Sequence, residues 1–295
     1  MFGHWSGAFR NCSVKAGASA GQPASEHPYS AETLRIDGMT EQRRGRGDNA
    51  EWRQKHRFSV IGIIGELFIT AGVLVLLFLG WQLWLNDLFV GADQNTVGVA
   101  LANDWDSASP THATVTPKPG VAFGEPTVAT APKNAAQFAV MYVPRFGADY
   151  TRSISEGVGT TDVLDKNGIG HYPGTQMPGQ VGNFAVAAHR TTHGAPFKML
   201  ASLQVGDTIY VQTQDGYYSY AFRGLEYVRP TGVGVLDPVP QSPSVAPTDR
   251  ILTMTSCNPM FSAAERIIAY AVLESWQPTS AGAPQAIQAT TTAIG

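Results

Sequence analysis

Cys257 is the residue whose type and place in the sequence most directly suggest covalent chemistry. It is one of only two cysteines among 295 residues, and it lies in the stretch TMTSCNP, where an apolar run gives way to a loop. A thiolate is a strong nucleophile, but an unperturbed thiol is mostly protonated at neutral pH and needs a base or a cation beside it. A reactive Cys257 therefore requires such partners elsewhere in the chain.

Two candidate partners for the thiol lie, like Cys257 itself, at the end or the start of an apolar run. His189 ends the apolar run FAVAAH and precedes a loop, as Cys257 does. Side chains at the ends of strands are held by a rigid scaffold, which is a common arrangement for a catalytic pair. Arg266 lies nine residues after Cys257, at the start of the next apolar run. Its guanidinium either stabilises an oxyanion near the thiol or forms a surface ion pair.

Other polar residues near these three are weaker candidates. Thr255 and Ser256 add hydroxyl and N–H groups directly before the thiol, either as part of an oxyanion and substrate site or as polar residues of a strand edge. His193 follows His189 in the same loop and is either a substrate contact or a solvated side chain. His171, in GIGHYPGT, is interpreted as a loop residue that makes structural hydrogen bonds.

Three other interpretations of Cys257 compete with that of a nucleophile. A disulfide to Cys12 is excluded if a membrane segment separates the two cysteines, as argued next. We expect no metal site and no cofactor, on the reasoning that the residues beyond that segment offer no second cysteine, no HxxxH pair, no HExxH motif and no acidic cluster for calcium. A buried thiol that only fills space stays open, since free cysteine is often buried.

Residues 58–85 predict a transmembrane helix. Glu66 is their only ionisable residue, and the 19 residues from 67 to 85 can cross a ~30 Å hydrocarbon core at ~1.5 Å per residue. A signal peptide would start nearer residue 1 and be shorter. Lys and Arg occur six times in residues 43–57 and not at all in residues 86–117, which predicts a cytoplasmic N-terminus and an extracellular remainder.

The rest of the chain divides by composition. Residues 1–57 predict a disordered cytoplasmic arm, residues 86–137 a Thr/Ala/Pro-rich extracellular linker, and residues 277–295 a disordered tail. Residues 138–276 contain short β-type runs punctuated by Gly and Pro, which predicts an all-β sandwich or barrel, with residues 195–203 as the best helix candidate. The predicted strands are 138–144, 182–189, 207–213, 217–228, 250–256 and 266–276. The net charge of −3 gives no indication of a nucleic-acid surface.

The segments GIGHYPGTQMPGQVGNFAVAAHR, HRTTHGAPF and TMTSCNPMFSAAER together resemble the sortase family. Members carry a motif close to T-L-x-T-C, a His in a GHR-like segment, and an Arg on the following strand. The resemblance covers residues 138–276 and is greatest to class E sortases of actinobacteria. Met254 and Ser256 stand where the motif has Leu and Thr, Ala188 replaces a common Gly, and His193 stands where class E members often carry Tyr.

This resemblance implies a closed eight-stranded β-barrel with short helices and the activity of a membrane-anchored cysteine transpeptidase. It implies that Cys257 attacks the Thr–Gly carbonyl of an LPxTG- or LAxTG-like sorting signal near the C-terminus of a secreted protein. His189 would act as acid and base, and Arg266 would stabilise the oxyanion or position the substrate. A peptidoglycan precursor or a pilin lysine would then supply the amine that resolves the thioacyl intermediate.

Two other kinds of function remain open on the sequence. Another wall-acting thiol enzyme, such as an L,D-transpeptidase, would place a His a few residues before its Cys or use a different fold, and no His lies just before Cys257. A non-enzymatic, membrane-anchored β-barrel binding module with a buried thiol is the other possibility. An iodoacetamide-type reagent separates this module from the enzymes, because a buried thiol does not react.

Overall fold

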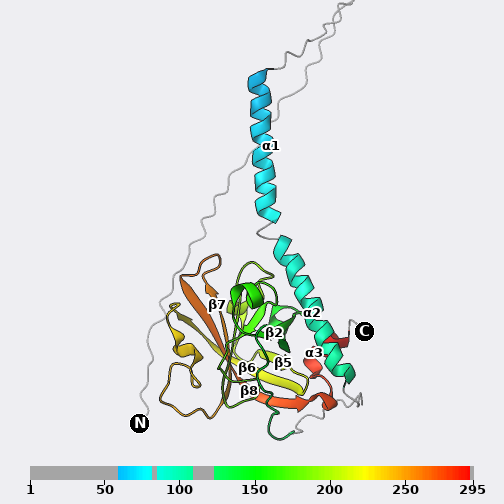
Figure 1. Ribbon diagram of the computed structural model, residues 1–295, viewed down its shortest axis with the longest axis vertical. Helices are drawn as coiled ribbons and strands as arrows, with labels where there is room; N and C mark the ends of the chain where they lie inside the picture. The colour runs from blue at the N-terminus through cyan, green and yellow to red at the C-terminus, as the bar shows by residue number, and fades with distance from the viewer. Residues whose placement is uncertain (1–58, 82–84, 109–122, 293–295) are drawn as a thin grey trace, which may run out of the picture. The chain divides into compact units, whose positions relative to one another are not determined.

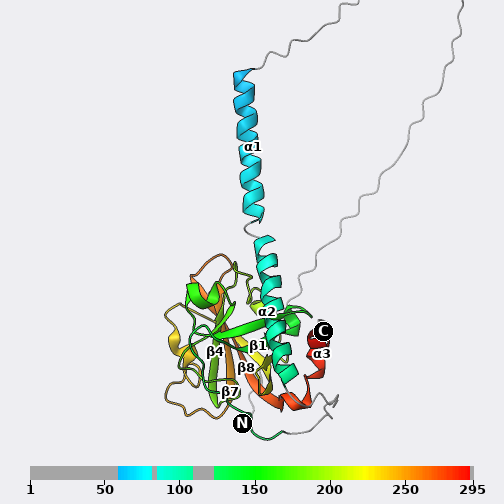
Figure 2. The same cartoon turned by 45° about the vertical axis from the view of Figure 1, so that its right-hand side comes forward.

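The computed structural model describes residues 59–81, 85–108 and 123–292. The arm expected over residues 1–57 lies outside these ranges. The helices are α1 (Val60–Gly80), α2 (Asn86–Ala108) and α3 (Gln285–Thr292), and the strands all lie between α2 and α3 in sequence. Figures 1 and 2 show the strands gathered into one barrel, with α2 and α3 packed beside it.

Helix α1 is long and apolar enough to cross a membrane, by length and composition. Its 21 residues extend about 30 Å at ~1.5 Å per residue. The hydroxyl of Ser59 accepts a hydrogen bond from the Gly62 N–H and caps the first turn. Large apolar side chains such as Leu67 and Phe68 are exposed along the helix, as contact with lipid tails would require.

The eight strands close into a barrel in the order β1-β2-β3-β4-β7-β8-β6-β5, which confirms the expected fold class. They are β1 (Gln137–Tyr142), β2 (Thr151–Glu156), β3 (Ile169–His171), β4 (Gly182–Ala188), β5 (Thr208–Gln212), β6 (Gly216–Val228), β7 (Arg250–Asn258) and β8 (Glu265–Pro278). The pairs β2–β3 and β4–β7 are parallel, and the other pairs are antiparallel. Parallel strands cannot be joined by a tight turn, and the connection from β2 to its parallel partner β3 accordingly takes up residues 157–168.

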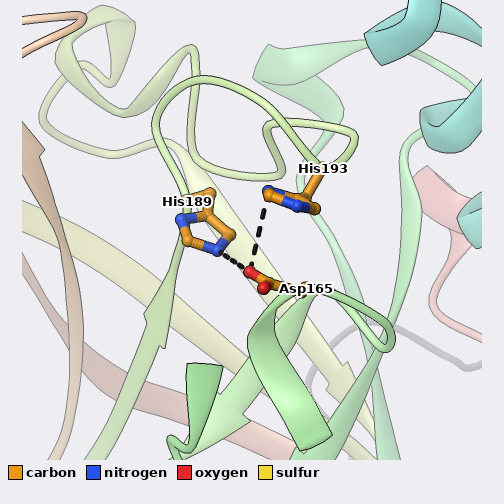
Figure 3. Close-up of side chains that lie close together, drawn as sticks. All are labelled: Asp165, His189 and His193. Carbon is orange, nitrogen blue, oxygen red and sulfur yellow. Dashed lines mark hydrogen bonds and ion pairs between the residues drawn. The ribbon is translucent and has the colours of Figure 1, made fainter. Parts of the chain in front are cut away.

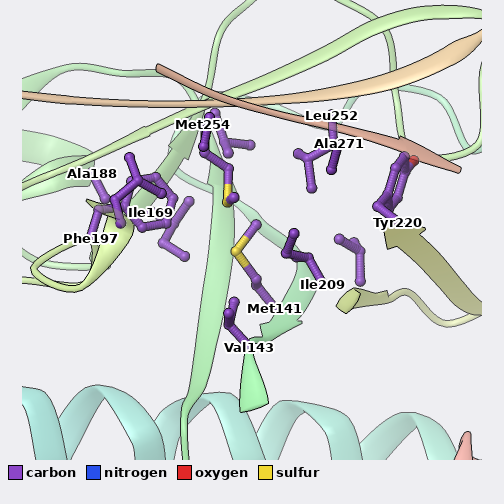
Figure 4. Packing of buried hydrophobic residues seen from close by; sticks show 14 of the residues in the cluster. Met141, Val143, Ile169, Ala188, Phe197, Ile209, Tyr220, Leu252, Met254 and Ala271 are labelled. Atoms are coloured by element: carbon purple, nitrogen blue, oxygen red, sulfur yellow. The ribbon is translucent and has the colours of Figure 1, made fainter. Parts of the chain in front are cut away.

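Alternation along the strands fills the barrel interior. On β1, Ala139 and Met141 face the main core, while Val140 and Tyr142 face a second cluster outside the barrel. Figure 4 shows Met141 packed with Met254 and other apolar side chains of the main core. Each large apolar side chain that is fully buried contributes about 1.5–3 kcal/mol, so this core fixes the positions of the strand ends around it.

Residues 86–108 form helix α2, although the sequence predicted an extended linker over residues 86–137. The buried residues of α2 recur with a helical period and are mostly small: Gly91, Gln94, Gly98, Val99 and Ala102. A Cβ on Gly98 would come within 3.1 Å of Thr151 on β2, so glycine lets the helix backbone lie close to the barrel. The prediction of a linker was wrong for residues 86–108, because the buried face of this helix lacks the large apolar side chains that mark a helix in a sequence.

The far end of α2 is joined to the barrel by a polar network. The Tyr217 hydroxyl donates to both carboxylate oxygens of Asp106, at 3.0 and 3.2 Å. Burial, together with the charge of Asp106, raises the pKa of Tyr217. Gln212 on β5 also donates to Asp106, at 3.1 Å. These bonds hold α2 against the barrel because each buried polar group has a partner there.

Two further expectations differ from the structure. The tail predicted from residue 277 is partly ordered: β8 continues to Pro278, and Ile287 of α3 is buried with Ala102 of α2 in the second cluster. The helix predicted over residues 195–203 is instead a series of turns ending in a single 3-10 turn, Leu200–Ser202. Strands β2 and β3 were not predicted, because β2 (TRSISE) is polar in sequence and β3 has only three residues.

Candidate active site

Cys257, His189 and Arg266 lie at one end of three adjacent strands. Cys257 is paired directly with Arg266 across β7 and β8. On the other side, β4 and β7 are parallel, with Ala187 opposite Thr255. Two residues further along each strand direction, His189 therefore comes level with Cys257. The sheet register thus aligns His189 with two residues that lie much later in the sequence.

The three side chains lie on the outer face of the barrel. Core-facing residues lie an odd number of positions away from each residue of the site. Ala188 precedes His189, Ile267 follows Arg266, and Met254 lies three positions before Cys257. Alternation therefore turns Cys257 and its two partners outward. Cys257 is half-buried, and the His189 side chain is 22% exposed. A thiol in this position is reachable from solvent, which disfavours the interpretation of Cys257 as a sealed space-filling residue.

Asp165 binds His189 and was not identified from the sequence. It follows the π-helical turn η3 (Thr160–Leu164), which lies in the connection between β2 and β3. Its Oδ1 lies 2.8 Å from His189 Nε2, as Figure 3 shows. An ionised carboxylate can only accept a hydrogen bond, so this contact favours a proton on Nε2, and in a neutral imidazole Nδ1 is then the nitrogen with the free lone pair.

His193 lies beside His189 and shares Asp165 with it. The two imidazole centroids are 5.0 Å apart, and His193 Nδ1 lies 3.6 Å from Asp165 Oδ1. Asp165, His189 and His193 each offer one metal-ligating atom, and these atoms lie within 4.8 Å of one another, close enough to hold a metal ion. The expectation that these residues hold no HxxxH pair was wrong, because His189 and His193 have that spacing in the sequence and lie together in the structure.

Ser256 and Thr255 are buried and bonded within the barrel. The Ser256 hydroxyl donates to the Ala188 carbonyl at 2.8 Å and so joins β7 to β4. The Thr255 hydroxyl lies 3.0 Å from the hydroxyl of Tyr172. These contacts favour a positioning role for both side chains, and their contact with a substrate stays a prediction.

Arg190 is a second residue that the sequence analysis did not single out. It is only 7% exposed, and its Nη1 donates to Asn258 Oδ1 at 3.0 Å and to the Cys257 carbonyl at 3.5 Å. Its Nε donates to the Lys198 carbonyl at 3.4 Å. Burial lowers the pKa of the Arg190 guanidinium. Arg190 therefore ties the loop after His189 to the end of the strand that carries Cys257.

Arg266 is half-buried and bonded to the backbone of its own turn. Its Nη1 donates to the carbonyls of Ala263 and Glu265, at 3.0 Å each. Among the described residues, no ion pair joins Arg266 to Glu265 or Glu274, and Glu274 pairs with Arg223 at 2.9 Å instead. The surface ion pair considered for Arg266 is therefore not formed, and the residue stays paired with Cys257 through the register of β7 and β8.

His171 is structural, in agreement with the sequence analysis, but it lies on β3 rather than in a loop. It is fully buried, with Nδ1 2.6 Å from Glu156 Oε2 and Nε2 2.9 Å from the Thr175 hydroxyl. Both ring nitrogens have partners inside the barrel. The base candidate near Cys257 is therefore His189.

The closed β-barrel thus carries Cys257, His189 and Arg266 at the ends of three adjacent strands, on its outer face. The sortase domain model matches residues 141–274. Sortase SrtE1 of Streptomyces coelicolor is 35% identical over 230 residues, which are 76% of this chain and 60% of SrtE1, so the chain spans less than two thirds of that relative.

Two solved structures agree with this match. The SrtA sortase from Actinomyces oris is 36% identical, with 57% of this chain and 96% of that chain covered and a TM-score of 0.54. The SrtF sortase from Corynebacterium diphtheriae is 32% identical, with 56% of this chain and 98% of that chain covered and a TM-score of 0.51. The chain belongs to the sortase family, and its similarity to SrtE1 supports a class E-like member.

Proposed function

We propose that this chain is a membrane-anchored cysteine transpeptidase. It cleaves an LPxTG- or LAxTG-like sorting signal near the C-terminus of a secreted protein and joins that protein to an amine of the cell wall or of a pilin. The observation that carries the proposal is the strand register that aligns Cys257 with His189 and Arg266. Sortase-family membership supports the same class of reaction.

The first half-reaction is acylation of the thiol. The Cys257 proton passes to Nδ1 of His189, since Nε2 is engaged by Asp165. The thiolate attacks the carbonyl carbon of the Thr–Gly bond, and the negative charge that develops on the carbonyl oxygen is stabilised by the Arg266 guanidinium. The C–N bond then breaks, the departing amine takes the proton from His189, and a thioester to Cys257 remains.

The second half-reaction transfers the acyl group. An acceptor amine loses a proton to Nδ1 of His189 and attacks the thioester carbonyl. The C–S bond breaks, the proton returns to the sulfur, and a new amide joins the two partners. Helix α1 would keep the enzyme at the membrane, where both a secreted substrate and a lipid-linked wall precursor pass.

The decisive experiment uses the purified full-length protein with a panel of sorting-signal peptides and candidate amines, followed by mass spectrometry. Wild-type protein should cleave a peptide between Thr and Gly and form a thioester adduct on Cys257. Cys257→Ala should reduce cleavage by at least about a thousandfold, because no other group can take over nucleophilic attack. Its melting temperature should change little, because Cys257 is only half-buried.

Cys12→Ala is the matched control, because it removes the other cysteine and should leave cleavage intact. Cleavage by Cys257→Ala at the wild-type rate would overturn the mechanism. Stable protein that cleaves none of the peptides and whose Cys257 resists alkylation would favour the non-enzymatic binding module instead.

A further inference from the structure

We propose that Asp165, His189 and His193 form a binding site for a divalent transition-metal ion, with zinc as the probe. One ligand atom from each side chain lies within 4.8 Å of the other two. The separations from Asp165 Oδ1 are 2.8 Å to His189 Nε2 and 3.6 Å to His193 Nδ1. Figure 3 shows both imidazole rings directed at the same carboxylate oxygen.

The donor set suits zinc better than magnesium or calcium. Two imidazoles and one carboxylate, with a position left for water, form a set that zinc accepts, whereas magnesium and calcium prefer oxygen ligands. Zinc bonds of about 2.0–2.2 Å place tetrahedral ligand atoms roughly 3.4 Å apart. The separations of 2.8 and 3.6 Å lie on either side of that value, so small side-chain rotations would complete the geometry.

The loop that carries His193 is held in place by helix α2. Gln94 on α2 donates to the His193 carbonyl at 3.0 Å. The Asp87 carboxylate accepts from the N–H groups of Thr192 and Gly194, at 3.1 and 3.3 Å. Thr192 and His193 have positive φ angles of 65° and 50°, a conformation that persists only where neighbouring contacts impose it. A loop that is already fixed loses little entropy when an ion binds.

Zinc at this site would remove the catalytic base, a consequence that rests on the proposed function. The ion takes the lone pair of His189 Nε2, so the proton now shared with Asp165 leaves that nitrogen. A neutral imidazole that binds zinc through Nε2 carries its single proton on Nδ1. One proton therefore leaves Nε2 for solvent and one binds Nδ1 from solvent, so the number of protons on the ring is unchanged. Nδ1 can then no longer accept the thiol proton, so zinc becomes a reversible inhibitor.

The test measures zinc affinity of metal-free, full-length protein in detergent by competition with a chromophoric chelator. Asp165→Asn and His193→Gln should each weaken zinc binding at least tenfold, and magnesium should not compete. The melting temperature of each variant is measured without metal. If one variant is misfolded, the zinc affinity of the other still tests the proposal. Cys257→Ala should bind zinc as tightly as wild type, because the thiol is not a ligand.

The result that overturns the proposal is zinc affinity that is unchanged in folded His193→Gln, or that is abolished in Cys257→Ala, which would place the ion on the thiol. Peptide cleavage is a separate readout: zinc should inhibit it, and a chelator should restore it. If zinc binds through the three residues and no peptide is cleaved even without metal, the metal site stands and the proposed transpeptidase activity fails. If cleavage is robust and zinc does not bind, only the metal site is lost.

Discussion

Hydrogen-bond direction at His189 determines which of its nitrogens can serve as a base. Asp165 engages Nε2 at 2.8 Å, so in the proposed mechanism proton exchange with the thiol falls to Nδ1. Without the carboxylate, the ring can rotate and can take either tautomer, and only part of the population would then have a basic nitrogen facing Cys257. In the proposed mechanism Asp165 is therefore a positioning residue, which acts on the thiol through its contact with His189.

We expect Asp165→Ala to lower kcat/KM for peptide cleavage by about tenfold or more, equivalent to ~1.4 kcal/mol or more of transition-state stabilisation. The loss should appear in kcat rather than KM, because the carboxylate acts on His189 and not on the peptide. The 15N chemical shifts of the His189 ring, which report the tautomer, should move in the same variant.

Asp162→Ala is the matched control for that substitution. Asp162 belongs to the same turn, η3, but it accepts from Asn134 at 2.6 Å and does not face His189. An equal loss of kcat in both variants would mean that Asp165 only stabilises the turn.

Residue types and strand ends were enough to single out Cys257, His189 and Arg266, and the strand register aligns these positions, while their catalytic roles stay predictions. Each of the three lies where an apolar run begins or ends, and such boundaries are visible in the sequence. Asp165 and Arg190 gave no such signal. Asp165 lies 24 residues before His189, and only the connection between the parallel strands β2 and β3 brings it close. A contact that depends on the topology of the sheet has no local sequence pattern.

Among the elements, α2 has the clearest link to the site. Its first turns contact the loop after β4, where Asp87 accepts from two N–H groups and Gln94 donates to a carbonyl. The same helix lies along β2, where Asn95 accepts from the Thr151 N–H at 2.9 Å. Helix α2 therefore supports the conformation of the loop that carries His193, as well as the stability of the barrel.

We expect Asp87→Ala to loosen this loop without unfolding the protein. The amides of Thr192 and Gly194 lose their acceptor, so their hydrogen exchange should become at least about tenfold faster, as expected for a loss of ~1.4 kcal/mol in local opening free energy. Mass spectrometry or NMR of exchanging amides measures the effect. Asp93→Ala is the control, because Asp93 is an exposed carboxylate on the same helix. Unchanged exchange at both amides in Asp87→Ala would show that the loop does not depend on α2.

Periodicity in the sequence was a good guide to strands and a poor one to α2. Strands such as β4 and β7 carry β-type apolar runs that mark them in the sequence. The face of α2 that contacts the barrel contains the small residues Gly91, Gly98 and Ala102. Small side chains allow the helix backbone to lie close to the barrel backbone. Small residues produce no apolar stripe, so the segment resembles a linker in composition while it packs as a helix.

For the whole molecule, the central expectation is that α1 divides the chain between two compartments. Six Lys and Arg residues in residues 43–57, against none in residues 86–117, favour a cytoplasmic N-terminus. We expect the barrel to lie outside the membrane, where secreted substrates are available. The chain contains a natural probe of this arrangement, because its only two cysteines, Cys12 and Cys257, lie on opposite sides of α1 in the sequence.

A membrane-impermeant maleimide applied to intact cells that express the protein should label Cys257 and leave Cys12 unlabelled. After lysis, Cys12 should also react, because the membrane alone protects it. The variants Cys12→Ala and Cys257→Ala assign each label to its cysteine, and a maleimide that crosses membranes controls for intrinsic reactivity. Labelling of Cys12 but not of Cys257 in intact cells would reverse the orientation and remove the barrel from the compartment that its proposed substrates occupy. Labelling of Cys257 alone would place a reactive thiol on the outer side of the membrane, as sorting at the cell surface requires.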